Sequence, residues 1–454
     1  MSELLSRRTL LQAALAQTRR LPNILLLLAD DMGSADLSSY GATDIRTPNI
    51  DSIGRDGIRF TRAYCNAPEC TPSRTALLTG RYQQRVGGME CAMGVGNVGR
   101  YDEAIWLRER NQFGLPVSET SLARMLKGRG YDTACIGKWH LGYTPEFSPN
   151  AHGFDHYFGI LGGNADYYKH TEEDGAPVLY ENGKPVKREG YLTELFGLAA
   201  VDWLGERKQK PWFLYVPFNA PHSPFQTPQK RDIPPGTWNK GDRRTYAGMV
   251  EAMDKQVGAI LDQLKVINAV DNTWVIFLSD NGGAQPAASN APLRGFKSSV
   301  YEGGLRTAMM MRWPGVFRPG SSTAQVSLMF DVTAAILAAA GAKPNRPLDG
   351  ENLLPVWTGK QPVKPRTVFW RYRRAEATRK AVLHGEWKLT NNSGKEELFH
   401  LKSDPKEENS QLTAQPAIAK DLRNRLTKWE QDVRAPRLAD FYRTREQNSP
   451  NPRL

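Results

Sequence analysis

The chain has 454 residues, of which 40% are hydrophobic and 24% are charged, an ordinary composition for a globular protein with a large core. Its formal net charge of +12 is spread thinly, without a long Lys/Arg block or a recognisable nucleic-acid-binding module, so nucleic acid is not an expected partner. The 4 cysteines show no paired C-x-x-C spacing, which argues against a disulfide framework and against structural zinc.

The first 20 residues contain Ser6-Arg7-Arg8 followed by two leucines, a pattern typical of a twin-arginine export signal. We therefore expect a leader over residues 1–20, with an irregular lead-in as the alternative. A working leader would place the protein in the periplasm or outside the cell, and without one it would stay in the cytoplasm. We expect no membrane span, because no apolar run is long enough to cross a bilayer.

Four short apolar runs each end in polar residues, at 23–29, 131–137, 212–218 and 274–279. Runs this short and this apolar are typical of strands buried on both faces. Helical spacing of apolar residues lies between them, most clearly at 121–130 and 243–264. The alternation predicts an α/β fold in which a large, mostly parallel β-sheet is sandwiched by helices.

The pattern changes near residue 360, where GKQPVKP at 359–365 is typical of a linker. Short alternating segments then predict a small antiparallel sheet, and residues 417–433 predict a helix. The basic run at 371–380 is interpreted as a solvated face rather than a binding site. After the lead-in we expect a main α/β domain, a small C-terminal α+β subdomain and a flexible tail, at residues 21–360, 361–436 and 437–454.

Acidic and amide side chains follow the first and the fourth apolar run. Asp30 and Asp31 end the first, and Asp280 and Asn281 end the fourth. Because ligands bind beyond the carboxyl ends of parallel strands, we expect these four side chains to lie close together. Oxygen ligands suit a hard cation such as calcium or magnesium. The alternative for each pair taken alone is a turn, for which Asp, Asn and Gly are the usual residues.

The stretch CTPSRTALLTGR at residues 70–81 predicts the start of a helix. Thr71 or Ser73 would cap this helix, and Pro72 suits its first turn. The alternative is that Cys70 is a reactive centre, because a helix N-terminus attracts anions. Cationic side chains expected at the same edge would bind a compact oxyanion and stabilise charge as a bond to it breaks; they are Arg74, Lys138, His140, His222 and Lys297.

Several short motifs occur in a fixed order over residues 22 to about 315: ADD, C-x-P-S-R with LLTGR, GKWHLG, APH, SDNGG and YEGG. In this order they resemble the type I sulfatases, the formylglycine-dependent arylsulfatase family of the alkaline phosphatase superfamily. HGEWKL, EELFHL and SDPKEE also resemble the small domain of that family. The resemblance covers nearly the whole chain and implies an alkaline-phosphatase-like fold and a sulfuric-ester hydrolase.

The same resemblance implies a role for each candidate residue. A maturation enzyme that reads C-x-P-x-R would bind the chain transiently and convert Cys70 to formylglycine (3-oxoalanine). Calcium, with magnesium less favoured, would be held by an oxygen of the modified Cys70 and by Asp30, Asp31, Asp280 and Asn281. Arg74 would steady the formylglycine hydrate. The sulfate would be surrounded by Lys138, His140, His222 and Lys297.

The implied chemistry uses an aldehyde hydrate, which carries two hydroxyls on one carbon. One hydroxyl, activated by the cation, attacks sulfur and forms a covalent sulfate ester. His222 or Lys297 supplies a proton to the leaving alcohol. The second hydroxyl then loses its proton to His140, so that the aldehyde forms again and sulfate leaves.

We expect the substrate to be a sulfated carbohydrate, with aryl sulfate esters as artificial substrates. Side chains in GGNADYYKHTEED could shape a sugar-binding mouth, while the alternative is a loop packed against its own domain; they are Tyr167, Tyr168, Lys169 and His170. Two other functions stay open at this point. One is a phosphonate- or phosphate-ester hydrolase of the same superfamily, and the other is a non-catalytic protein that binds sulfated polysaccharide.

Overall fold

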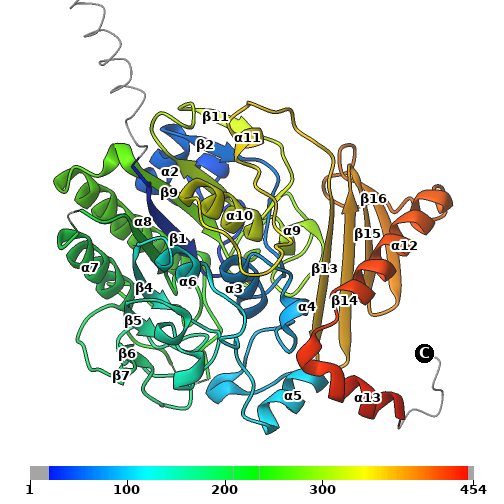
Figure 1. Cartoon of the computed structure of the whole chain (residues 1–454), viewed down its shortest axis with the longest axis horizontal. Coiled ribbons are helices and arrows are strands. Elements are labelled where there is room, and N and C mark those ends of the chain that lie inside the picture. Colours follow the sequence, from blue (N-terminus) through cyan, green and yellow to red (C-terminus); the bar gives the residue numbers. More distant parts are fainter. Residues whose placement is uncertain (1–19, 208, 235, 448–454) are drawn as a thin grey trace, which may run out of the picture.

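The computed structural model describes residues 20–207, 209–234 and 236–447 (Figure 1). The predicted leader before Arg20 therefore lies outside the described residues. A ten-stranded sheet, with the strand order β11-β2-β10-β9-β1-β8-β4-β5-β6-β7, forms the centre of the larger part of the molecule. Its strands are β1 (Asn23–Ala29), β2 (Ile58–Phe60), β4 (Asp132–Lys138), β5 (His156–Ile160), β6 (Leu179–Glu181), β7 (Lys184–Pro185), β8 (Trp212–Pro217), β9 (Thr273–Ser279), β10 (Met309–Arg312) and β11 (Ser321–Thr323).

The four predicted strands lie side by side in the middle of this sheet, in the order β9-β1-β8-β4, and all three pairings between them are parallel. Every residue of β1 is buried. Ile24 and Leu26 face one hydrophobic core, whereas Leu25 and Leu27 face another. A strand covered on both faces has no polar side, which explains the continuous apolar run.

Helices cover both faces of the sheet, which confirms the predicted α/β architecture (Figure 1). One core includes side chains of α3 (Cys70–Thr79), α6 (Leu122–Lys127) and α10 (Met329–Ala340). The other core includes side chains of α2 (Pro48–Arg55), α7 (Leu192–Gly205) and α8 (Arg243–Val266). Shorter elements are β3 (Ala63–Tyr64), α4 (Gln83–Val86), α5 (Asp102–Glu109), α9 (Glu302–Leu305), β12 (Ser327–Leu328) and α11 (Leu354–Trp357).

The C-terminal part forms the predicted small antiparallel sheet, with the strand order β13-β14-β15-β16. Its strands are β13 (Thr367–Arg374), β14 (Ala377–His384), β15 (Trp387–Asn392) and β16 (Lys395–His400). Helix α12 (Pro416–Asp432) lies beside this sheet and buries Leu422, Leu426 and Trp429 (Figure 1). These side chains belong to the same hydrophobic cluster as α3 and α10, so one continuous core joins the two parts.

The expectation of a flexible tail from residue 437 is wrong as far as Gln447, because helix α13 spans Ala439–Gln447. Phe441 packs edge-on against Trp106 with ring centroids 6.1 Å apart, and Tyr442 also packs against the core. Burial of these two aromatic side chains stabilises the segment. Residues 448–454 lie outside the described residues.

The interpretation of residues 371–380 as a solvated face holds for residues 374–376, which are exposed, but not for Arg371. The Arg371 side chain is 11% exposed and forms ion pairs with Glu90 at 2.7 Å and with Glu430 at 3.2 Å. Charges in this run balance acids from other elements, which the local sequence does not reveal.

Within the described part of the chain, no helix combines the length and the apolar character that a membrane crossing requires.

Candidate active site

The carboxyl ends of β9, β1, β8 and β4 meet at one edge of the sheet, as the parallel pairings require. Two further segments reach this edge: the start of α3 and the loop between β9 and α9. Contacts given below join nine of the residues predicted for the site, namely Asp30, Asp31, Cys70, Arg74, Lys138, His222, Asp280, Asn281 and Lys297. His140, the tenth, lines the same cavity as Cys70, His222 and Lys297.

Cys70 is the first residue of α3 and is 1% exposed. Its Sγ lies 3.3 Å from Asp30 Oδ1, 3.8 Å from Asp31 Oδ1 and 3.6 Å from Lys297 Nζ. Burial, and then the charge of Asp30, raise the pKa of the Cys70 thiol well above its usual value. The thiol therefore stays protonated and is a poor nucleophile as an unmodified cysteine.

The predicted capping of α3 is wrong, although the helix is present. The helix begins at Cys70, so Thr71 and Ser73 lie inside its first turn rather than before it. The Thr71 hydroxyl donates to the carbonyl of His140 at 3.0 Å, and the Ser73 hydroxyl donates to the carbonyl of Ala67 at 2.7 Å. The Thr71 bond joins the helix that carries Cys70 to the backbone of His140.

The acidic and amide side chains form one buried cluster. The Asp31 backbone N–H donates to Asp280 Oδ1 at 3.2 Å, and Asn281 Nδ2 donates to Asp31 Oδ1 at 2.8 Å. Ligand atoms of Asp30, Asp31, Cys70 and His222 all lie within 4.8 Å of one another. The carboxylates thus share one small volume beyond the ends of β1 and β9.

Arg74 and Lys138 compensate part of this negative charge. The Arg74 guanidinium donates twice to Asp280 Oδ2, at 3.0 and 2.9 Å, and once to the Lys138 carbonyl at 2.9 Å. Its Nη2 lies 3.6 Å from Asp30 Oδ1. Lys138 Nζ lies 2.5 Å from Asp30 Oδ2, and these four side chains are fully buried. Arg74 therefore contacts the acidic cluster directly. It is connected to Cys70 through Asp30, whose Oδ1 lies near both the Arg74 guanidinium and the Cys70 thiol.

Lys297, His222 and Asp31 form a triangle beside Cys70. Lys297 Nζ donates to Asp31 Oδ2 at 2.7 Å and lies 3.2 Å from His222 Nε2. Burial opposes the charges, but Lys297, His222 and Lys138 lower the pKa of Asp31. Burial lowers the pKa of His222 to about 3. The charge of Asp31 opposes this shift, and the charges of Lys297 and Lys138 add to it. His222 is therefore neutral near pH 7, and its Nδ1–H donates to the Ser223 carbonyl at 2.7 Å.

His140 is also neutral and holds one defined tautomer. Its Nε2 lies 3.1 Å from the Met93 carbonyl, which can only accept, so the proton is on Nε2. Burial, and then the charge of Lys138, lower the pKa of His140 well below its usual value. Nδ1 is buried and has no hydrogen-bond partner in the described part of the chain. An imidazole nitrogen with a free lone pair is thus available at the site.

The acidic cluster fits a hard divalent cation. Three carboxylates and one amide supply oxygen donors, the ligand type that calcium and magnesium prefer. Asn281 Oδ1 is buried and no described residue donates a hydrogen bond to it. Burial, and then the neighbouring Asp30, raise the pKa of Asp280 to about 6. A cation would satisfy the amide oxygen and relieve the repulsion between the carboxylates.

A cavity of about 240 Å³ opens above Cys70. His140, His222 and Lys297 line it together with Arg100, Tyr143, Asn164, Glu173, Asn239 and Arg374. Asn164 and Glu173 belong to the segment GGNADYYKHTEED that the sequence analysis proposed for the mouth, whereas the other four residues were not selected. Arg374 lies in the basic run that was interpreted as a solvated face.

The proposed mouth residues at 167–170 do not line this cavity. Tyr167 is fully buried, and its hydroxyl donates to the carbonyls of Asn219 and His222, at 2.8 and 2.9 Å. His170 is buried beside the Gly190 carbonyl. Tyr167 and His170 therefore pack against their own domain, whereas Asn164 and Glu173 of the same segment line the cavity. Tyr167 supports the loop that carries His222.

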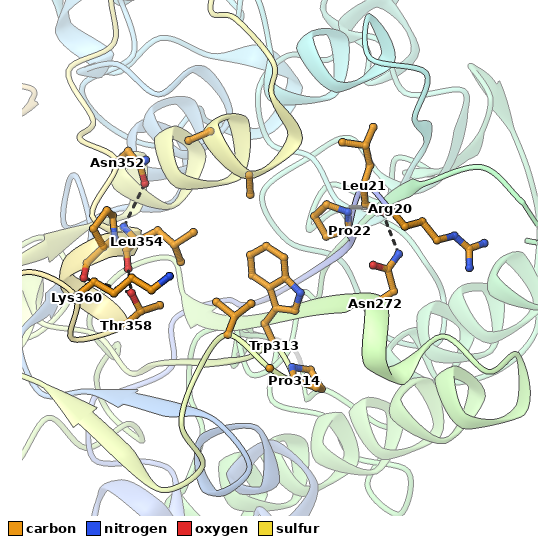
Figure 2. A pocket seen from close by; sticks show the side chains of 15 residues that line it. Arg20, Leu21, Pro22, Asn272, Trp313, Pro314, Asn352, Leu354, Thr358 and Lys360 are labelled. Atoms are coloured by element: carbon orange, nitrogen blue, oxygen red, sulfur yellow. Dashed lines mark hydrogen bonds between the residues drawn. The ribbon is translucent and has the colours of Figure 1, made fainter. Parts of the chain in front are cut away.

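A larger cavity, of about 690 Å³, lies at the opposite edge of the sheet. Figure 2 shows Trp313 between Leu354 on one side and Leu21 with Pro22 on the other. Leu21 and Pro22 precede β1, and Trp313 follows β10, which runs antiparallel to β9. None of the candidate acids, cations or Cys70 lines this cavity. Chemistry rather than volume thus selects the cavity above Cys70 as the candidate active site.

Comparison with known proteins shows the family of this chain. A family model described as Sulfatase matches residues 22–342, and one described as N-sulphoglucosamine sulphohydrolase, C-terminal, matches residues 296–432. N-acetylgalactosamine-6-sulfatase of Homo sapiens is 36% identical over 354 residues, which are 74% of this chain. The match spans 65% of that relative's own length.

Solved structures show the same fold. Ps i-CgsB, determined in complex with k-i-k-neocarrahexaose, superposes with a TM-score of 0.81 at 33% identity and covers 92% of this chain and 94% of its own. The phosphonate monoester hydrolase of Agrobacterium radiobacter superposes with a TM-score of 0.63 at 20% identity, covers 91% of this chain and 96% of its own, and shows the fold alone. With the Sulfatase match extending over most of the main sheet and its site, this chain belongs to the sulfatase family, as the order of its motifs predicted.

Proposed function

We propose that this protein hydrolyses sulfate esters through a formylglycine made from Cys70, next to a calcium ion held by the acidic cluster. The observation that carries the proposal is the position of Cys70, whose Sγ lies within 4 Å of two carboxylates and of Lys297. Membership of the sulfatase family supports it. An unmodified, protonated thiol in this place has little reactivity, which fits a residue that is converted before it acts.

In this proposal the cation is held by Asp30, Asp31, Asp280 and Asn281, with an oxygen of the modified residue 70. Calcium is favoured over magnesium because the set mixes carboxylates with an amide oxygen and needs no strict octahedral arrangement. When bound, a divalent ion polarises sulfate oxygens and lowers the pKa of a hydroxyl beside it. Arg74 then has a supporting role: its two bonds to Asp280 hold that carboxylate in place.

Lys297 and His222 act together on the leaving alcohol in this proposal. Burial works against the charge of Lys297, but Asp31 and the other acidic groups nearby raise its pKa well above the usual value. Lys297 therefore carries a proton next to the unprotonated Nε2 of His222, 3.2 Å away. The pair can move one proton toward the oxygen of the leaving group, and Asp31 keeps the lysine in position.

His140 is the general base for the second half of the reaction. The Met93 carbonyl accepts a hydrogen bond from Nε2–H of the ring, so Nδ1 carries the lone pair. No described residue donates a hydrogen bond to Nδ1. A neutral imidazole with a fixed tautomer is suited to remove a proton from a hydroxyl on residue 70. Lys138, paired with Asp30, adds positive charge near the position of the sulfate oxygens.

We propose a sulfated carbohydrate as the natural substrate, with aryl sulfates as artificial ones. Two comparisons support this: the human relative is named for N-acetylgalactosamine-6-sulfate, and the similar structure Ps i-CgsB was solved with a neocarrahexaose. Polar side chains around the cavity, including Asn164, Asn239 and Tyr143, can bond sugar hydroxyls. A maturation enzyme for Cys70 and export through the N-terminal leader also remain parts of the proposal.

The alternative within enzymes is a phosphonate- or phosphate-ester hydrolase, whose substrate shares the shape of a sulfate ester. The shared fold of a phosphonate monoester hydrolase keeps this alternative open. A third possibility is a protein that binds sulfated polysaccharide without hydrolysis. The complete set of acids, cations and Cys70 at the site argues against it.

The test is to express the full chain with a formylglycine-generating enzyme and to measure turnover of 4-nitrophenyl sulfate and 4-nitrophenyl phosphate. We expect faster turnover of the sulfate, loss of it in Cys70→Ala, and the aldehyde form in the intact mass of the peptide that contains residue 70. Faster turnover of the phosphate would establish the alternative. A fully converted protein that hydrolyses neither ester would favour the binding protein.

A further inference from the structure

The mouth of the cavity above Cys70 contains two arginines that the proposed reaction does not use. Arg100 lies in the loop before α5, and Arg374 is the last residue of β13 in the C-terminal sheet. The two segments are joined by a hydrogen bond of 2.7 Å from the Ala375 N–H to the Arg100 carbonyl. Two guanidinium groups from distant parts of the sequence therefore stand beside one opening.

Arg100 has no partner for its charge. Its side chain is half-buried, and none of the described residues forms a hydrogen bond or an ion pair with its guanidinium. A guanidinium offers five N–H donors and no acceptor, so a half-buried one without acceptors is costly. Acceptors from a ligand would satisfy it.

Arg374 is partly neutralised and firmly placed. Its Nη1 lies 3.0 Å from Glu69 Oε1, and its side chain is 43% exposed. Glu69 in turn accepts hydrogen bonds from Ser298, Tyr372 and the Ala92 N–H, so its carboxylate is shared among several donors. Arg374 thus uses one N–H group to bind Glu69, the residue directly before Cys70, and keeps its other donors toward solvent.

Both guanidinium groups act on the same surroundings. The charges of Arg374 and Arg100 both lower the pKa of the Cys91 thiol, against the larger effect of burial. Glu173 also lines the cavity and is exposed, so it opposes part of this charge at the rim. Lys297 and Arg374 at the mouth are each paired with an acid, whereas no described acid pairs with Arg100.

We propose that Arg100, assisted by Arg374, forms a subsite for a second oxyanion of the substrate, a sulfate or a carboxylate on the same or a neighbouring sugar. This inference rests on the proposed function, because it assumes that the scissile sulfate lies over residue 70. Guanidinium groups bind sulfate and carboxylate through paired hydrogen bonds, so the subsite selects sugars with two anionic groups over sugars with one.

The test measures binding separately from turnover. The Cys70→Ala full-length chain is titrated by calorimetry with three probes: galactose 6-sulfate, a disulfated galactose disaccharide without uronic acid, and a monosulfated disaccharide with a uronic acid. We expect at least one doubly anionic probe to bind at least about 10-fold more tightly than galactose 6-sulfate, the range of a charge-assisted hydrogen bond. The disulfated and the uronic acid probes distinguish a second sulfate from a carboxylate.

Adding Arg100→Gln should remove most of the tighter binding of the doubly anionic probe. Arg100→Lys should retain part of it, because lysine keeps the charge but cannot form the paired hydrogen bonds of a guanidinium. Arg318→Gln, at an exposed position in the segment after β10, is the matched control and should change nothing. Equal affinity for singly and doubly anionic probes, or an advantage that survives in Arg100→Gln, would overturn the inference. Loss of the advantage in Arg100→Gln together with an inactive matured wild type would overturn the proposed hydrolysis and leave the anion subsite standing.

Discussion

Lys297 illustrates how single residues set the chemistry of this site. It comes from a loop rather than a strand end, yet its ammonium group contacts Asp31, His222 and Cys70. Its side chain is 19% exposed, so water screens this charge little. Charge balance in the acidic cluster therefore depends on a residue that no regular element positions.

Replacing Lys297 with alanine removes both the proton held beside His222 and the charge that compensates Asp31. We expect kcat for 4-nitrophenyl sulfate to fall by about 10²–10⁴, the range usual for a general acid that also stabilises charge. Lys265→Ala is the control, because that lysine is 68% exposed and its partner among the described residues is Asp262 of the same helix. Activity within a few-fold of wild type in Lys297→Ala would refute the role given to this lysine.

The orphaned amide oxygen of Asn281 leads to a prediction about metal. Dialysis of the matured protein against EGTA should abolish turnover and lower Tm, because the crowded carboxylates lose their counter-ion. Calcium should restore both more fully than magnesium. Metal analysis should find bound calcium in the wild type and little in the double variant Asp30→Asn/Asp31→Asn. Full activity in a metal-free preparation would exclude the proposed ion.

At the scale of elements, the loop after β8 depends on a tyrosine from another loop. The Tyr167 hydroxyl bonds the carbonyls of Asn219 and His222, and its ring stacks on Tyr191 with centroids 5.1 Å apart. Strand β8 delivers the loop to the correct edge of the sheet. The orientation of His222 within that loop is set by contacts outside the strand.

Tyr167→Phe should therefore reduce kcat several-fold and destabilise the protein by about 1–3 kcal/mol, because the His222 carbonyl loses its donor and the Asn219 carbonyl keeps only the bond from the His222 N–H. Tyr157→Phe is the matched control: this tyrosine is equally buried, but its hydroxyl has no hydrogen-bond partner among the described residues. Removing that hydroxyl should leave Tm unchanged or raise it. If Tyr167→Phe behaved like Tyr157→Phe in both kcat and Tm, the support for His222 would lie elsewhere.

At the scale of the whole molecule, the C-terminal sheet completes the site rather than standing apart from it. Tyr372 and Arg374 of β13 both bond Glu69, the residue before Cys70. Farther from the site, Lys388 of β15 lies 2.8 Å from Glu302 and 2.9 Å from Glu407, and these three side chains are fully buried. The two parts of the chain are thus joined by a shared apolar core and by a buried ionic cluster.

Lys388→Met should leave the buried Glu407 carboxylate without the cation that pairs with it and leave Glu302 with Arg306 alone. We expect this to cost about 3–5 kcal/mol of stability, as is usual when one partner of a buried ion pair is removed. The measurement is the shift of Tm in thermal unfolding. Lys395→Met is the control, because this lysine is 70% exposed in β16 and its ion pair with Glu397 contributes little. Equal Tm values for the two variants would show that the cluster does not stabilise the junction.

The sequence alone was sufficient for the parallel centre of the fold. Strands buried on both faces must be apolar throughout, so β1, β4, β8 and β9 are visible as uninterrupted apolar runs. Parallel pairing then requires their carboxyl ends to meet, and the residues that follow each run meet with them. For this reason Asp30, Asp280 and Lys138 could be assigned to one site without a structure.

Only the tertiary structure decided which side chains surround that site and which partner each charge has. Arg100 and Arg374 belong to segments with no periodic pattern, and Arg371 resembles a surface residue until Glu90 and Glu430 are seen beside it. Phe441 of helix α13 packs against Trp106, which is far away in the sequence. The local sequence determines the periodic pattern of buried and exposed residues. Ion pairs, histidine tautomers and cavity walls depend on contacts between segments that are far apart in the sequence, and a local pattern does not show which of those segments meet.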